Sequence, residues 1–213
     1  MTYRGAEMAT KDTDVTPNRR GALSREAVLD AAERVMAEHG FEGATLARVI
    51  EASGVPASSI YHYFGSKEGL LVAVMHRGAE RFFAGLPELD ELRGTPEEHL
   101  RLAVAALRAA LEANPEFLRL MILLAAQPAG ARAPEAVDVV RQVRDEGRRR
   151  LRGQYAIAFG EDEGSPAAER AAQLSLAIID GTFVAAQADP TVGPMATLDL
   201  LPSVMRAASA GHT

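Results

Sequence analysis

The sequence predicts an all-α protein, and three observations support this prediction. The chain is rich in alanine, leucine, arginine and glutamate, which favour helices. No stretch shows the sustained alternation of apolar and polar residues that marks a half-buried strand. Proline and glycine instead separate segments whose apolar residues recur every three or four positions. With 213 residues, the chain is long enough to bury a sizeable core.

Composition excludes several classes of protein. The absence of cysteine rules out disulfides, thiol catalysis and thiolate zinc sites. No HExxH pattern, Gly-x-Ser-x-Gly elbow or glycine-rich phosphate loop is present, so we expect neither an enzyme nor a metal or cofactor site. Because no apolar run is long enough to span a membrane and no signal peptide is evident, we expect a soluble cytoplasmic protein without membrane contact.

The first 22 residues are polar and show no periodicity, so they are predicted to form a flexible arm that ends in Arg19 and Arg20. A helical pattern begins at Ser24, which suits an N-cap. Gly40 is expected to end this first helix, as glycine often does.

Two short helices follow and predict a helix-turn-helix motif at about residues 45–64. Thr45 can cap the first, over residues 46–52, and the second covers residues 57–64. Gly54, between them, permits the positive φ that such a turn requires. Ile60 and Phe64 would anchor the second helix to the core. Its exposed arc would then hold Ala57, Ser58, Ser59, Tyr61 and His62.

Six longer segments complete the predicted helical set. Ser66 caps one that stops near residues 85–87, with Glu68 in its first turn, where the helix dipole favours a carboxylate. The others begin at or beside a proline, except the last, and cover about residues 96–114, 115–127, 134–160, 166–189 and 196–210.

The motif and its flanks resemble the tetracycline-repressor (TetR) family of transcriptional regulators. The resemblance covers about 48 residues in the correct order and spacing. It rests on Ser24-Arg25-Glu26-Ala27, Ala31-Ala32, Gly40-Phe41, Ala44-Thr45-Leu46, Ile50, Ser53-Gly54-Val55 and Ile60-Tyr61-His62-Tyr63-Phe64-Gly65-Ser66-Lys67-Glu68-Gly69-Leu70. Two departures are Pro56, in place of a small N-cap residue, and Val49 beside Ile50.

The resemblance implies a DNA-binding role for eight residues. Thr45, Arg48 and Lys67 would contact phosphates, although Arg48 could also reach a base edge. Tyr61 and His62 would bond the DNA backbone. The base-reading face would be made of Ala57, Ser58 and Ser59.

The resemblance also implies a dimer formed through residues 166–188 and 196–210, and a cavity for a small hydrophobic effector. The first stripe of the interface would be Leu174, Ala177, Ile178, Gly181 and Ala185, and the second Leu198, Leu201, Val204 and Met205. Apolar candidates for the cavity wall are Phe82, Phe83, Phe117, Met121, Leu124, Phe159 and Phe183.

Each assignment has a structural alternative. Tyr61 and Tyr63 could be core aromatics, Lys67 a solvated lysine, and Arg48 a partner of Glu42 or Glu51. The two stripes could pack inside the subunit, and the apolar candidates could be ordinary core residues. His76 and His99 could give the cavity polar specificity or be satisfied elsewhere. The arginine run could bind an acidic ligand or DNA, or form a solvated face with Asp145 and Glu146; it comprises Arg141, Arg144, Arg148, Arg149, Arg150 and Arg152.

These patterns predict three parts: an arm at residues 1–22, a DNA-binding domain at 23–68, and a ligand-binding and dimerisation domain at 69–210. The predicted function is that of a repressor released from a palindromic DNA operator by a small hydrophobic ligand. The alternative is a helical dimer that binds small molecules without binding an operator.

The charge of the chain limits how such a protein could bind DNA. The formal net charge is −6. Residues 1–68 hold eight basic and ten acidic side chains, a net charge of −2. Any positive charge offered to DNA must therefore be arranged by face, which predicts few phosphate contacts and a shallow dependence of affinity on salt.

Overall fold

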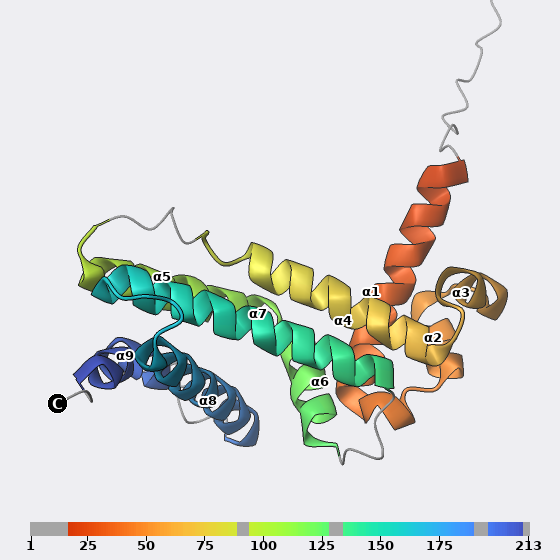
Figure 1. Ribbon diagram of the computed structural model, residues 1–213. Helices are drawn as coiled ribbons and strands as arrows, with labels where there is room; N and C mark the ends of the chain where they lie inside the picture. Colours follow the sequence, from red (N-terminus) through yellow and green to blue (C-terminus); the bar gives the residue numbers. More distant parts are fainter. Residues whose placement is uncertain (1–16, 89–93, 128–133, 190–195, 211–213) are drawn as a thin grey trace, which may run out of the picture.

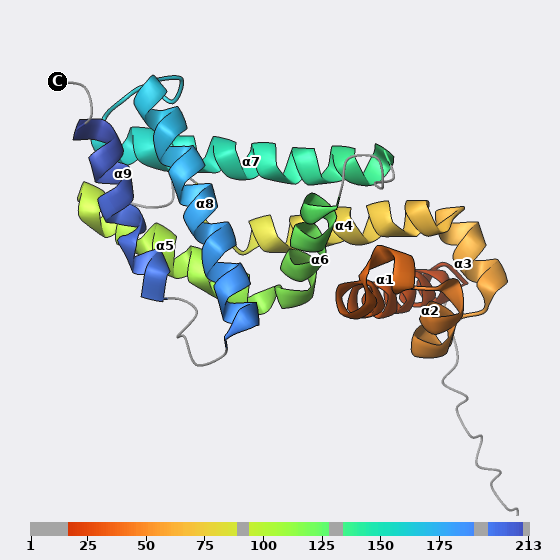
Figure 2. The same cartoon turned by 90° about the horizontal axis from the view of Figure 1, so that it is seen from below.

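The computed structural model describes residues 17–88, 94–127, 134–189 and 196–210. This part of the chain is helical and contains no strand, which confirms the all-α prediction. The helices form an elongated molecule, with α1, α2 and α3 at one end and α8 and α9 at the other (Figures 1 and 2). We call the first end the head and the remainder the body.

The head consists of α1 (Pro17–Gly43), α2 (Leu46–Ser53) and α3 (Ala57–Phe64). Gly40, with φ 69° and ψ 170°, interrupts α1, so the predicted stop at this residue is a break inside the helix. α1 packs against both shorter helices.

Helix α4 (Lys67–Ala84) connects the head to the body. Ser66 caps it as predicted, because its Oγ accepts a hydrogen bond from the backbone N–H of Gly69 at 3.0 Å. α4 contacts α1 and α3 in the head, and α5, α6 and α7 in the body. A change in the position of α4 would therefore alter contacts in both the head and the body.

The body contains α5 (Pro96–Ala113), α6 (Pro115–Ala126), α7 (Pro134–Phe159), α8 (Pro166–Ala188), a 3₁₀ turn η2 (Ala196–Leu200) and α9 (Leu201–Ala210). Proline opens four of the α-helices, where its missing N–H leaves no backbone partner unsatisfied. Thr95 and Glu98 form a reciprocal capping box on α5, and Ser165 caps α8.

One cluster of buried hydrophobic side chains extends from the head into the body. It runs from Val28 on α1 through Leu71 on α4 to Phe117 on α6 and Val143 on α7. α4 and α6 cross closely within it, since a Cβ at Gly78 would lie 2.3 Å from Cδ2 of Phe117. Glycine at this position is what allows the two helices to approach.

The start of α1 differs from the prediction. The helix begins at Pro17, so residues 17–22, expected in the arm, are helical and Ser24 is not an N-cap. Proline at a first helical position carries this start signal. Arg19 and Arg20 lie in these first turns, and residues 1–16 of the predicted arm lie outside the described residues.

Helix α8 is long and apolar enough to cross a membrane by length and composition alone. Only 28% of its most apolar window is buried, although it packs along α7 and α9. Part of its apolar surface thus faces outward on the body.

Candidate nucleic-acid interface and cavity

The two short helices of the head meet through a tight turn whose geometry follows from its residues. Thr45 caps α2, its Oγ1 accepting from the backbone N–H of Arg48 at 3.4 Å. Gly54 adopts the left-handed conformation with φ 68°, and its N–H donates to the carbonyl of Ile50. Pro56 offers no side-chain cap to α3, but its carbonyl accepts from the N–H groups of Ser59 and Ile60. The turn that the sequence predicts is therefore formed without the usual N-cap.

Helix α3 buries one face and leaves the other to solvent. Ile60 is buried and Phe64 packs partly against the core, as expected of the two anchors. The opposite arc carries Ser58 and His62, which are exposed, and Tyr61, whose exposed fraction is 55%. Ala57 and Ser59 flank it and are half-buried.

The two tyrosines of α3 have different surroundings. A Cβ at Gly21 of α1 would lie 3.7 Å from the hydroxyl of Tyr63, so half-buried Tyr63 supports the first turns of α1. Tyr61 lies on the exposed side of α3, and its exposure contradicts the alternative that it is a core aromatic. Sequence periodicity alone could not separate these two residues.

Arg48 and Lys67, the two cations expected at phosphates, both hold the corner that follows α1. The Arg48 guanidinium donates to the carbonyl of Gly43 at 3.2 Å, and the Lys67 ammonium donates to the carbonyl of Glu42 at 3.3 Å. The Lys67 ammonium also lies 4.3 Å from the centre of the Phe41 ring. Neither described bond goes to a carboxylate, so the positive charge of each residue remains uncompensated by these contacts.

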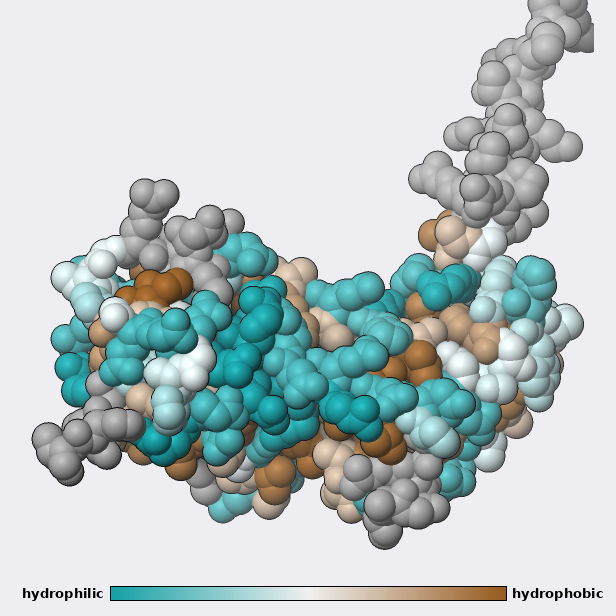
Figure 3. Space-filling model, viewed as in Figure 1, coloured by the Kyte–Doolittle hydropathy of each residue, from teal (hydrophilic) through white to brown (hydrophobic). Residues whose placement is uncertain are grey.

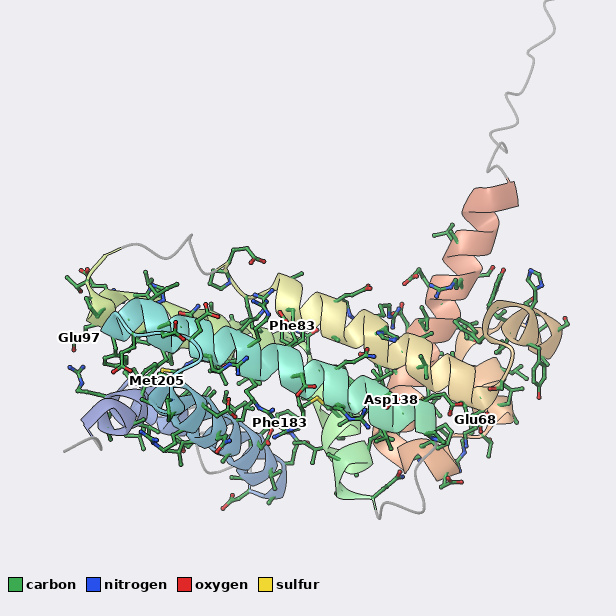
Figure 4. The ribbon with its side chains drawn as sticks, in the orientation of Figure 1. Glu68, Phe83, Glu97, Asp138, Phe183 and Met205 are labelled. Atoms are coloured by element: carbon green, nitrogen blue, oxygen red, sulfur yellow. The ribbon has the colours of Figure 1, made fainter. Side chains whose placement is uncertain are left out.

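Glu68, beside Lys67, adds a negative charge to the start of α4 (Figure 4). A hydrogen bond from its own backbone N–H lowers the pKa of Glu68, and the Ser66 hydroxyl lowers it further. The carboxylate is therefore ionised at neutral pH, where it stabilises the helix N-terminus.

A cluster of charges that the sequence analysis did not predict joins the head to α4. Glu33 is a buried carboxylate of α1, and it accepts hydrogen bonds from the guanidinium groups of Arg77 and Arg81. Arg77 also reaches Glu26 at 3.0 Å and Asp30 at 2.7 Å. Burial alone would lower the pKa of Arg77, but these carboxylates outweigh that effect and raise it. The spacing of Glu26, Asp30 and Glu33 was the available signal, because these residues share one face of α1.

The body encloses a cavity between α4, α5, α6, α7, α8 and α9. Water-sized molecules could occupy about 130 Å³ within it, and the free space between its atoms, including the part open to solvent, is about 1170 Å³. Phe83 reaches it from α4, Phe183 from α8 and Met205 from α9 (Figure 4). Five of the seven predicted wall residues line it: Phe82, Phe83, Phe117, Met121 and Phe183.

The other two predicted wall residues lie elsewhere, so those two predictions are wrong. Leu124 is buried in the main core. Phe159 packs on Tyr155 in a second core cluster near the end of α7, with ring centres 4.9 Å apart. Both positions have the apolar periodicity of a wall residue, but helical spacing does not distinguish a wall from a solid core.

Polar residues of the wall come chiefly from α7. Arg144 donates to Asp180 of α8 at 2.9 Å, and both line the cavity with Arg150 and Gln154. Gln154 forms a 2.5 Å hydrogen bond with buried His99, whereas His76 is exposed on α4. Of the two histidines considered for the cavity, only His99 thus lies beside it.

The arginine run on α7 is offset by carboxylates, which supports the solvated-face interpretation for most of its members. Arg141 pairs with Asp138, Arg148 with Asp145, and Arg149 with Glu146 on the same helix. Arg152 pairs with Glu169 of α8. Figure 3 shows the corresponding mostly hydrophilic band along α7 on the visible face.

The exposed apolar surface of α8 coincides in part with the stripe predicted for a dimer. Leu174 and Val184 are 50% and 47% exposed, and Ala177, Gly181 and Ala185 of the predicted stripe are exposed as well. A Cβ added at Gly181 would meet nothing within 4 Å. Ile178 is half-buried against the core.

The second predicted stripe is wrong in three of its four residues. Leu198, Leu201 and Met205 are buried inside the subunit, and Leu201 and Met205 line the cavity. Leu200, which is 55% exposed, and half-buried Val204 lie on the outer side instead. The segment has apolar residues on both faces, and the 3₁₀ turn at residues 196–200 shifts their register.

These features define a helix-turn-helix protein whose head is joined through α4 to a helical C-terminal domain. A family model described as bacterial regulatory proteins, tetR family, matches residues 28–74. The chain is thus similar to this family over α1–α3 and the first turns of α4.

The transcriptional repressor AcnR of Corynebacterium efficiens is 37% identical over 101 residues, which are 44% of this chain and 54% of AcnR. The chain thus spans about half the length of that relative. A crystal structure of a transcriptional regulator from Rhodococcus sp. Rha1 is 26% identical with a TM-score of 0.68, covering 88% of this chain and 97% of the other. The Bacillus subtilis regulator FadR, solved in complex with stearoyl-CoA, shares the fold at 22% identity and a TM-score of 0.64, with coverages of 88% and 99%.

Proposed function

We propose that this protein is a dimeric, sequence-specific DNA-binding regulator, a repressor that a small hydrophobic ligand releases from a palindromic operator. The observation that carries the proposal is the exposed arc of α3, opposite buried Ile60, in a head whose turn geometry is that of a helix-turn-helix motif. Such an arc can enter a major groove about 12 Å wide. We place the DNA-binding domain at residues 23–68 and the ligand-binding and dimerisation domain at residues 69–210.

In the proposed complex, α3 reads bases and the surrounding residues hold the DNA backbone. Ser58 and Ser59 donate to or accept from base edges, while the methyl group of Ala57 suits thymine. Exposed Tyr61 and His62 bond phosphate oxygens. Thr45, Arg48 and Lys67 lie around the corner after α1, where the described bonds of Arg48 and Lys67 go to backbone carbonyls.

The dimer is proposed to form through the outward face of α8. This face combines exposed small residues, Ala177, Gly181 and Ala185, with exposed Leu174 and Val184. Small residues allow two helices to approach closely, and a two-fold axis would place this stripe against its own copy. Two heads would then reach successive major grooves about 34 Å apart.

The cavity of the body is the proposed effector site. Its wall is mostly apolar and formed by six helices, including α4, which also contacts the head. A ligand that binds better to a conformer with wrongly spaced heads would release the operator. FadR, which has the same fold, was solved with stearoyl-CoA, and this supports a hydrophobic effector here.

The proposal is tested by fluorescence anisotropy with labelled DNA from upstream of the gene, titrated at several salt concentrations. We expect sequence-selective and salt-sensitive binding. Tyr61→Ala should weaken it about 10- to 100-fold, since hydrogen bonds to charged groups contribute roughly 1.5–3 kcal/mol. Leu102→Ala, at an exposed residue of α5, is the matched control and should leave affinity unchanged.

Two outcomes would contradict the proposal. Full affinity of Tyr61→Ala would show that α3 is not the reading helix. Absence of selective DNA binding by a dimer that still binds ligands would favour the alternative, a small-molecule-binding dimer without an operator.

We also infer a cytoplasmic location without membrane contact, because α8 packs along α7 and α9. We infer no enzymatic role.

A further inference from the structure

The wall of the cavity carries more positive than negative charge. Of the charged side chains that line it, two are guanidinium groups, Arg144 and Arg150, and one is a carboxylate, Asp180. The remainder of the lining is almost entirely apolar. The two arginines differ in where their counterions lie, and that difference identifies the one available to a ligand.

Arg144 is neutralised within the wall itself. Its guanidinium donates to Asp180 at 2.9 Å, and both side chains are about one-third exposed, at 33% and 32%. A ligand approaching this pair meets no net charge. Arg144 therefore gives the cavity no preference for an anion.

The counterions of Arg150 lie outside the cavity lining. Its Nε donates to Glu146 at 2.8 Å, but Glu146 also accepts two hydrogen bonds from Arg149, at 2.6 and 2.7 Å. One carboxylate thus serves two guanidinium groups, and the other carboxylates that act on Arg149, Glu88 and Glu163, are also outside the cavity lining. Glu88 is 3.5 Å away and 66% exposed, so solvent screens its contribution.

The guanidinium of Arg150 is also placed to interact strongly. Its side chain is only 16% exposed, and its Cζ lies 5.4 Å from the centre of the Phe83 ring, which itself lines the cavity. Arginine has five N–H donors, and the bonds to Glu146 and Glu88 use two of them. A partly desolvated cation with donors to spare binds a carboxylate more strongly than an exposed one would.

The size of the cavity limits the remainder of the ligand. At roughly 10–15 Å³ for each water-sized group, a space of about 130 Å³ has room for about ten non-hydrogen atoms. Apolar side chains from α4, α5, α6 and α8 form most of the wall of this space, so a second charged group would lose its hydration over most of the cavity.

We propose that the effector is a monocarboxylate amphiphile, an apolar chain or ring of about ten non-hydrogen atoms whose carboxylate binds Arg150. This inference rests on the proposed function of the cavity and adds the chemical class of its ligand. Arg150 is then the residue that selects the ligand by charge, while Phe83 and its apolar neighbours hold the tail.

Isothermal titration calorimetry of the full chain with three probes of equal length tests the proposal: octanoate, neutral octanamide and cationic octylamine. Octanoate should bind at least about tenfold more tightly than octanamide, because a charge-assisted bond adds roughly 1.5 kcal/mol or more. Octylamine should bind most weakly. Arg150→Gln should remove the advantage of octanoate and leave octanamide within about twofold of its original affinity. Arg152→Gln, on the same helix but outside the lining, is the matched control and should change neither.

The comparison of the three probes on the unchanged protein needs no variant, so the test survives even if Arg150→Gln fails to fold. Equal binding of octanoate and octanamide would overturn the carboxylate assignment while leaving the cavity as an effector site. Undiminished octanoate preference in Arg150→Gln would overturn the role of Arg150. No binding of any of the three, in a protein that still binds its operator, would overturn the effector cavity itself and this inference with it.

Discussion

The head and the body use their positive charges differently. Arg48 of the head and Lys67, at the start of α4 beside it, donate to backbone carbonyls at the corner after α1. In the body, most arginines pair with carboxylates, as Arg108, Arg141, Arg144, Arg148, Arg149 and Arg152 do, while Arg150 shares Glu146 with Arg149. A bond to a carbonyl leaves a cation charged, whereas a carboxylate offsets it.

This difference shows why a count of charges misleads for this protein. Residues 1–68 have a net charge of −2, yet Arg48 and Lys67, the cations beside α3, bond to carbonyls and not to carboxylates. Because they are few, the affinity of one head for DNA should be low. The affinity for DNA should therefore depend on dimerisation and on the individual cations beside α3. The stability of the body should depend on the pairing of its arginines.

The largest effect is expected from separating the two heads. Ala185→Arg places a charge on the exposed stripe of α8, where the monomer has room for it. Loss of the dimer should reduce operator affinity at least about 100-fold, because linked binding gains roughly 10²–10⁴. Sedimentation equilibrium and anisotropy would measure this, with Ala109→Arg on exposed α5 as the control. A dimer that persists in Ala185→Arg would place the interface elsewhere.

The next effect concerns the charges that join the head to α4. Leaving a buried charge without any partner costs roughly 3–5 kcal/mol. Glu33→Gln should lower the free energy of unfolding by less, about 2 kcal/mol, because Arg77 still pairs with Glu26 and Asp30. Glu26→Gln, a change of an exposed partner of the same arginine, should cost less than about 1 kcal/mol. Urea unfolding followed by circular dichroism measures both. Equal effects of the two changes would show that burial of Glu33 is unimportant.

A smaller effect tests the head cations directly. Lys67→Met keeps the apolar stem over Phe41 but removes the charge, so the head should stay folded. Operator affinity should fall about tenfold, and the slope of log affinity against log salt should become shallower by about 0.9 per subunit. The control is Arg101→Met on α5. An unchanged slope would mean that Lys67 serves only to hold the corner of α1.

The smallest effect concerns the pairing of body arginines and depends on pH. Hydrogen bonds from Arg149, and then from Arg150, outweigh burial and lower the pKa of Glu146 below its ordinary value of about 4.5. A lowered folded-state pKa contributes stability that is present above the unfolded pKa and is lost as pH falls through the folded one. The stability difference between the protein and Glu146→Gln should therefore shrink below about pH 4.5 in urea titrations. A difference that grows on acidification would contradict the pairing.

Local signals in the sequence predicted most helix boundaries. Ser66 caps its helix as expected, the predicted prolines open α5 and α8 directly after the capping residues Thr95 and Ser165, and Gly54 and Gly65 end α2 and α3. These signals act within a few residues, so a single segment carries them. The exposed arc of α3 followed in the same way, from the position of Ile60.

Other features depend on contacts between distant segments and were not predictable in this way. Leu201 and Met205 face inward because α9 packs on α8 and closes the cavity, although another apolar face was available. The bond of Lys67 joins residues 25 positions apart, and that of Arg77 to Glu33 spans 44 positions. Helical periodicity identifies an apolar face but not its partner.

The close crossing of α4 and α6 has a consequence for the range of molecules that the cavity admits. Phe117 lies between Gly78 and the cavity, with its ring against the bare backbone of α4. Any side chain at position 78 must displace this ring, and the open space beyond it is the cavity. The missing side chain of Gly78, which is not itself part of the wall, thus determines where this wall residue lies. A single methyl group at position 78 would move Phe117 and change the room inside the cavity.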